Sequence, residues 1–84
     1  MNRTEMNRVA RKMIADYCES INLNYCEKCG GTFGLAPAHR KKRRYYRTAE
    51  ELADPNEWIA LCQKCHMEIE YSKELTEEMF NRLR

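Results

Sequence analysis

The chain twice repeats a pattern of two cysteines separated by two residues, first as Cys26-Glu27-Lys28-Cys29 and again as Cys62-Gln63-Lys64-Cys65. Four thiolates at these spacings can surround one Zn2+ ion tetrahedrally. An 84-residue chain forms a single domain, and a core of that size rarely contributes more than about 3–5 kcal/mol. Zinc binding contributes on the order of 10–16 kcal/mol, which becomes folding energy. We therefore expect one domain, residues 1–84, with structural Zn2+ on Cys26, Cys29, Cys62 and Cys65.

The remaining cysteine, Cys18, falls within a helical pattern, which favours a packed thiol over a nucleophile or a ligand. The odd count of five cysteines, the polar amino terminus and the lack of an apolar segment long enough for a signal peptide or a membrane span all favour the reducing cytoplasm. In an oxidising compartment the other four cysteines would pair as disulfides, which is the alternative to zinc.

A strongly basic segment follows His39 between the two cysteine motifs. The net charge is only +2, but six of the eight residues from Arg40 to Arg47 are basic. Such a concentration attracts phosphate and gives salt-sensitive binding, whereas a solvated run without a partner would suffer repulsion among like charges. We expect contacts with a nucleic-acid backbone from Arg40, Lys41, Lys42, Arg43, Arg44 and Arg47. Of the neighbouring Tyr45 and Tyr46, either could stack on an unpaired base, and one is expected to pack beneath the loop.

Apolar spacing predicts an amino-terminal amphipathic helix over about residues 4–21. Its apolar face is expected to contain Met6, Val9, Met13, Tyr17 and Ile21. The opposite face carries Arg8, Arg11 and Lys12, which either keep the helix soluble or touch a nucleic-acid backbone.

Two short apolar runs predict strands at residues 35–39 and 57–61, and Pro37 places the first at a sheet edge. The segment 45–55 between them lacks strand periodicity and is expected to form a loop or a short helical turn. A helix should follow the second cysteine motif, from residue 63 to about 71.

A carboxy-terminal helix is predicted over about residues 77–84. Thr76 is expected to cap it, and Leu75 is expected to pack onto Phe80 as a hydrophobic staple. Its inward stripe would then be Leu75, Met79, Phe80 and Leu83.

This order of elements resembles the zinc-containing branch of the HNH endonucleases over about Tyr25–Tyr71. The similarity is carried by Cys26-x-x-Cys29-Gly30, by Ala38-His39-Arg40 and by Leu61-Cys62-Gln63-Lys64-Cys65-His66. The resemblance implies an α+β fold with a small ββα-metal core over about residues 25–71, stapled by the four-cysteine zinc site and flanked by the two terminal helices. It also implies metal-dependent hydrolysis of phosphodiester bonds in DNA.

In that family the histidine that ends the first strand is the general base, and the last histidine binds the catalytic divalent cation. His39 and His66 match these positions. Unperturbed imidazole titrates near pH 6.5, so a neutral base is available at physiological pH. The second cation, such as Mg2+, Mn2+ or Ni2+, would polarise the phosphate, while the four-cysteine zinc has no open position.

Two positions depart from the family pattern. The residue before the base is usually a second metal ligand, but here it is Ala38, which has no donor atom. The family's central asparagine matches Glu57, with Asn56 one place earlier, so Asn56 braces the base only if the alignment slips by one residue. Glu70, four residues after His66 on the predicted helix, either supplies the missing ligand or pairs with a surface lysine.

The main alternative is a catalytically inactive module that retains the scaffold and binds nucleic acid or a partner protein as a regulator or inhibitor. The pattern Cys62-Gln63-Lys64-Cys65-His66 also fits covalent haem attachment, but haem would require export and leaves the first cysteine motif unexplained. An iron-bound redox site would not need His39 or the basic segment. DNA is the expected partner, a protein of phage packaging or recombination machinery is the second candidate, and no membrane association is expected.

Overall fold

The computed structural model describes residues 2–84. Its helices and strands follow one another as α1 (Arg3–Ser20), β1 (Ala36–His39), α2 (Ala49–Ala53), β2 (Trp58–Leu61), α3 (Gln63–Ile69) and α4 (Lys73–Leu83), with single 3-10 turns η1 (Arg43–Tyr45) and η2 (Pro55–Glu57). The expected α+β class is confirmed in this coarse form: helices surround one two-stranded antiparallel sheet. In the described part of the chain, no helix is both long and apolar enough to cross a membrane.

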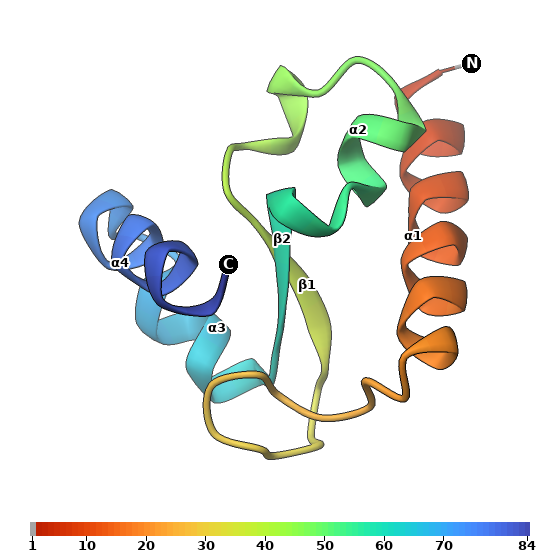
Figure 1. Ribbon diagram of the computed structural model, residues 1–84. Coiled ribbons are helices and arrows are strands. Elements are labelled where there is room, and N and C mark those ends of the chain that lie inside the picture. The colour runs from red at the N-terminus through yellow and green to blue at the C-terminus, as the bar shows by residue number, and fades with distance from the viewer. Residues whose placement is uncertain (1) are drawn as a thin grey trace.

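The sheet separates the molecule into two sides. Ala38 lies opposite Ile59, and His39 lies opposite Trp58. Residues directly opposite each other in a sheet project to the same face. Ala38 and Ile59 therefore face α3 and α4, whereas Trp58 packs beneath α1 and α2. Figure 1 shows the two strands between α1 on one side and α3 and α4 on the other.

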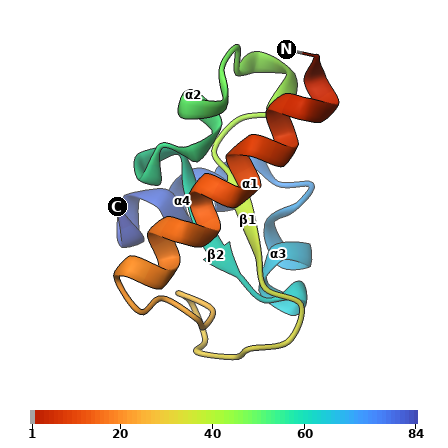
Figure 2. The same cartoon turned by 90° about the vertical axis from the view of Figure 1, so that its right-hand side faces the viewer.

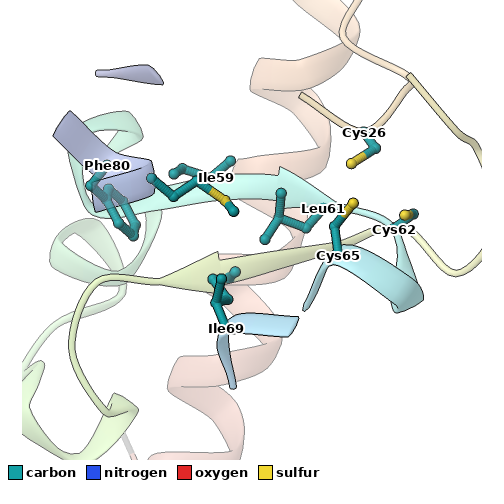
Figure 3. Close-up of a cluster of buried hydrophobic side chains, with 9 residues drawn as sticks. Cys26, Ile59, Leu61, Cys62, Cys65, Ile69 and Phe80 are labelled. Atoms are coloured by element: carbon teal, nitrogen blue, oxygen red, sulfur yellow. The ribbon is translucent and has the colours of Figure 1, made fainter. Parts of the chain in front are cut away.

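The core beneath α3 and α4 runs along one face of the sheet. Ile59 and Leu61 of β2 are fully buried against Phe80 of α4 and Ile69 of α3. In Figure 3, Phe80 lies at one end of this cluster, and the cysteines Cys26, Cys62 and Cys65 gather at the other. The apolar core and the cysteine site are therefore parts of one packed unit.

The core beneath α1 uses a different face of that helix from the one predicted. Met6, Ala10 and Ile14 are buried, whereas Met13, Tyr17 and Ile21 are exposed, with Ile21 at 51%. The list of expected core residues was therefore wrong for three of its five members. A small side chain such as alanine lets one helix approach another closely, and Ala10 packs in the same cluster as α2. Figure 2 shows α1 crossing the sheet on this side.

The carboxy-terminal helix begins earlier than predicted. Ser72 is the N-cap residue of α4, because its side-chain oxygen accepts from the backbone N–H of Leu75 at 3.2 Å. Thr76 lies inside the first turn, where its hydroxyl donates to the carbonyl of Ser72 at 2.8 Å. Leu75 is 46% exposed, so it is not part of the inward stripe. The predicted Thr76 cap and Leu75–Phe80 staple were thus wrong. The helix starts about one turn before Thr76, and Ser72 caps it by accepting from the N–H of Leu75.

Candidate metal centre and histidine site

The two cysteine motifs meet in space. The sulfur atoms of Cys26, Cys29, Cys62 and Cys65 all lie within 4.8 Å of one another. The Sγ atoms of Cys29 and Cys62 are 3.6 Å apart, close to the separation of about 3.8 Å that tetrahedral sulfurs have around zinc at a Zn–S distance of about 2.3 Å. The five cysteines are free thiols rather than disulfides. The donor set and its geometry therefore fit a metal ion such as zinc.

A tight turn positions the first pair of sulfurs. The backbone N–H of Cys26 donates to Gly31 at 2.7 Å, and the N–H of Gly30 donates back to Cys26 at 2.8 Å. Gly30 has φ +81°, a conformation that side chains rarely adopt. A Cβ on Gly31 would lie 3.3 Å from the sulfur of Cys29. Gly30 is thus favoured by the backbone conformation of the turn, and Gly31 by its close approach to the Cys29 sulfur.

The environment of the cluster favours thiolate at one position and disfavours it at another. Burial alone would raise the pKa of Cys26, but hydrogen bonds from the backbone of Cys29, Cys62 and Lys28 outweigh it and lower this pKa to about 6. Burial, followed by the neighbouring cysteine sulfurs, raises the pKa of Cys65. Four thiolates in one place repel each other, and a bound divalent cation removes that repulsion and deprotonates its ligands.

Cys18 is separate from this cluster and packs partly buried against the core beneath α1. Burial is the main cause that raises the pKa of its thiol. A thiol with a raised pKa is a poor nucleophile and a poor ligand, which agrees with the packing role expected from its helical position.

His39 is held at the end of β1 by a backbone carbonyl. Its Nε2 lies 2.7 Å from the oxygen of Leu52 in α2. A carbonyl only accepts hydrogen bonds, so Nε2 carries the proton and Nδ1 of the neutral imidazole keeps its lone pair. Burial is the largest influence that lowers the pKa of His39, with Arg43 acting in the same direction and the Leu52 carbonyl opposing them. His39 is therefore half-buried and predominantly neutral at pH 7.

A polar chain connects the surroundings of His39 to the start of β2. The ring of Tyr46 meets the His39 ring edge-on, with centroids 5.5 Å apart. The Tyr46 hydroxyl donates to Glu57 at 3.0 Å, and Glu57 also lies 3.5 Å from Arg40. Burial, reinforced by Glu57, raises the pKa of Tyr46 to about 12, so this hydroxyl remains a donor. Glu57, rather than its exposed neighbour Asn56, reaches this chain with its side chain.

The other predicted catalytic residues lie on or near α3. His66 is half-buried in the first turn of that helix, and Glu70 is exposed at its end. His39 lies opposite Trp58, on the face of the sheet beneath α1 and α2, whereas α3, which carries His66, packs on the other face. Ala38 is 3% exposed in the apolar core. Within residues 2–84, the four cysteines are the only group of three or more side chains close enough to hold a metal ion.

The basic segment is anchored to α1 by an arginine that the sequence pattern did not single out. Arg3 donates to the carbonyls of Arg43 and Tyr46, at 2.9 and 2.7 Å. Arg40 is used internally, since its guanidinium stacks on the Phe80 ring at 4.5 Å from the centroid. The remaining predicted phosphate contacts are exposed, namely Lys41, Lys42, Arg43, Arg44 and Arg47. Tyr46 is the buried member of the tyrosine pair, and Tyr45 is exposed.

Comparisons of the chain with protein-family models, with curated proteins and with solved structures returned no match. These comparisons do not test the resemblance to HNH endonucleases, which stays a prediction from the sequence motifs.

Proposed function

We propose that this protein is a metal-dependent endonuclease that hydrolyses phosphodiester bonds in DNA, with a structural zinc on its four cysteines. In this proposal His39 is the general base and His66 is a ligand of the catalytic cation. The observation that carries it is the hydrogen bond from Nε2 of His39 to the Leu52 carbonyl. That bond fixes the tautomer and leaves Nδ1 of a neutral imidazole available to accept a proton.

The reaction assigned to these residues is the hydrolysis of a phosphodiester bond by water. A water oxygen forms a bond to phosphorus, the bond from phosphorus to the leaving oxygen breaks, the proton of the attacking water passes to Nδ1 of His39, and the leaving oxygen takes a proton from solvent. A divalent cation on His66, with Glu70 as the candidate second ligand, would polarise the phosphate and stabilise the leaving oxygen. The exposed cations from Lys41 to Arg47 hold the phosphate backbone.

Ala38 favours a second candidate function. Its side chain is buried among apolar neighbours on the face of the sheet that looks toward α3, where the family resemblance would place a metal ligand. A protein without that ligand could retain its fold and its basic segment while having lost catalysis. It would then act as a regulator or inhibitor that binds nucleic acid or a partner protein.

Plasmid nicking by zinc-loaded protein separates the two functions. Supercoiled DNA is incubated with Mg2+, Mn2+ or Ni2+, using wild type, His39→Ala, His66→Ala and Glu70→Ala. Met67→Ala, which removes an exposed side chain beside His66, is the matched control. A nuclease nicks with at least one cation, loses activity in both histidine variants and keeps it in the control. Salt-sensitive DNA binding without nicking by any cation would refute catalysis and support the binding module.

A further inference from the structure

A groove of about 530 Å3 lies between α1 and the face of the sheet that α1 covers. Its walls include the apolar side chains of Ile14, Ala15, Cys18, Leu23 and Leu35. Grooves that bind small organic groups have volumes of about 300–1,000 Å3 and predominantly apolar walls with a few polar groups. This groove is therefore large enough for a small organic group.

Two arginines line the same groove, Arg11 from α1 and Arg43 from η1. Arg40 and Arg84, by contrast, are already in ion pairs, Arg40 with Glu57 and Arg84 with Glu27. Within residues 2–84, the guanidinium groups of Arg11 and Arg43 have neither an ion pair nor a hydrogen bond. Two unpaired guanidinium groups beside an apolar surface are suited to an anion joined to an apolar group, because a guanidinium binds phosphate with paired donors.

The groove continues toward His39. A second cavity, of about 10 Å3, is lined by His39 and Asn7 and shares Arg11 and Arg43 with the groove. It has room for about one water molecule. The side-chain oxygen of Asn7, a residue that lines this cavity, is buried without a hydrogen-bond partner in the described part of the chain. The anion site of the groove thus lies next to the proposed general base.

We infer that this groove binds one unpaired nucleotide, with its phosphate on Arg11 and Arg43 and its base against the apolar wall. The inference deepens the proposed function and depends on it for the choice of ligand. A base within a duplex is stacked and paired, so it cannot enter a groove in the protein, whereas a base from a single strand, a flap or a frayed end can. The substrate class is therefore DNA that contains unpaired nucleotides.

The basic segment favours a nucleotide over an acidic peptide as the occupant. Arg43 is one member of a series of exposed cations that continues through Arg44 to Arg47, and the phosphates next to the bound nucleotide would lie along it. Tyr45 in the same segment is 61% exposed and can stack on a neighbouring base. An acidic peptide could pair with the two arginines at the groove, but it would give no role to the cations that follow Arg43 or to the exposed ring of Tyr45.

The test is fluorescence anisotropy with a labelled 12-nucleotide single strand and the duplex of the same sequence. The zinc-loaded protein is used without added divalent cation, so binding is measured without cleavage. Arg11→Gln and Arg43→Gln each remove one guanidinium, and Ala15→Trp fills the groove. Arg82→Gln is the matched control, because it removes the same charge from α4 on the other side of the sheet. Thermal melting verifies that each variant is folded.

We expect wild type to prefer the single strand, and each groove variant to weaken single-strand binding by about tenfold, as loss of one charge-assisted contact predicts. Duplex binding by Arg11→Gln and Ala15→Trp, and binding of both DNAs by the Arg82→Gln control, should change by less than about twofold. Arg43→Gln also removes a cation of the basic segment, so it should weaken duplex binding too, but by less than it weakens single-strand binding. Equal affinity of wild type for the two DNAs, or equal losses on both in Arg11→Gln or Ala15→Trp, would overturn the inference. Binding of a leucine-containing acidic peptide that Ala15→Trp abolishes, with single-strand binding unaffected, would assign the groove to a protein partner and also overturn it.

These outcomes are distinct from failure of the proposed nuclease. Nicking that requires both histidines, together with no preference for the single strand, would refute the groove site and leave the enzyme in place. A single-strand preference that is lost in the groove variants, together with no nicking by any cation, would refute catalysis and leave the groove as a binding site.

Discussion

Arg84 and Glu27 form a doubly hydrogen-bonded ion pair between the end of α4 and the first cysteine motif, with Nη1–Oε1 at 2.6 Å and Nη2–Oε2 at 2.9 Å. Arg84 also donates to the backbone carbonyls of Trp58 and Pro55, and Glu27 accepts from the backbone N–H of Ala60 at 2.6 Å. Both side chains are largely buried. This pair joins three segments that are far apart in the sequence.

Replacing Arg84 by alanine should lower the free energy of unfolding by about 3 kcal/mol, because Glu27 would be left largely buried without its partner. Arg84→Lys should recover less than half of the loss, since an ammonium group cannot reproduce two parallel hydrogen bonds. Urea denaturation measures both variants. Arg82→Ala, which changes an exposed arginine on the same helix, should stay within about 0.5 kcal/mol of wild type, and an equally small effect of Arg84→Ala would show that the pair is not stabilising.

Removing the metal should unfold the protein. The apolar cores are small, and zinc binding at four thiolates contributes on the order of 10–16 kcal/mol. We expect one zinc per chain by elemental analysis and loss of the helical circular dichroism signal in strong chelator. Cys65→Ser should reproduce that loss, whereas Cys18→Ser should keep both zinc and fold. Native dichroism in fully zinc-free protein would contradict this prediction.

His39 should make stability depend on pH. Burial, the largest influence, lowers the pKa of His39 below its usual value, so the unfolded chain binds the proton more tightly than the folded protein does. Stability from this residue is therefore fully present above about pH 6.5 and is lost as the pH falls from there through the folded-state pKa. Nuclear magnetic resonance titration measures the pKa directly.

The same spectra test the tautomer of His39, whose Nε2 should carry the proton at pH 7 because it donates to Leu52. In His39→Gln the fall in unfolding free energy between pH 7 and pH 5 should be smaller than in wild type. A His39 pKa above 6.5 or a proton on Nδ1 would oppose the assignment of this residue as a base.

Features set by local chemistry were predictable from the sequence. Thiol spacing identified the four residues of the cysteine cluster, and glycines with positive φ accompany the turn that follows Cys29. Short apolar runs placed both strands within one residue of their observed bounds. These signals depend on neighbours one or two positions away, which a linear sequence displays directly.

Contacts between distant segments were not predictable. The group that orients His39 is the backbone carbonyl of Leu52, and no side-chain pattern can indicate a backbone group. Arg3 resembled any exposed arginine until the fold brought it to η1. On α1 the prediction favoured the most hydrophobic stripe, but packing selected the face with the small side chain of Ala10.

The cap of α4 can be assigned by two substitutions of similar size. Ser72→Ala removes the side-chain acceptor for the N–H of Leu75 and should cost about 1 kcal/mol in thermal or urea unfolding. Thr76→Ala removes only a hydroxyl that donates to carbonyls one turn earlier, and should cost less than half as much. A larger loss from Thr76→Ala than from Ser72→Ala would restore Thr76 as the cap.

Ala38→Asp tests whether a catalytic cation belongs between β1 and α3. Ala38 is buried in the apolar core, so a carboxylate there should lower the free energy of unfolding by about 3 kcal/mol without added metal. Ala15→Asp, on α1, is the control for introducing the same charge at an exposed position, and should be within about 0.5 kcal/mol of wild type.

Adding a divalent cation shows whether the aspartate of Ala38→Asp acts as a metal ligand or only destabilises the core. If His66 is the other ligand, millimolar Mn2+ should recover part of the stability of Ala38→Asp, because a ligand that binds only the folded state stabilises it by mass action. The recovery should disappear in the double variant Ala38→Asp/His66→Ala, and the restored site should increase plasmid nicking at the same Mn2+ concentration. If Mn2+ has no effect on stability or nicking, the aspartate does not reach a cation bound by His66, and the binding module becomes the better account of this protein.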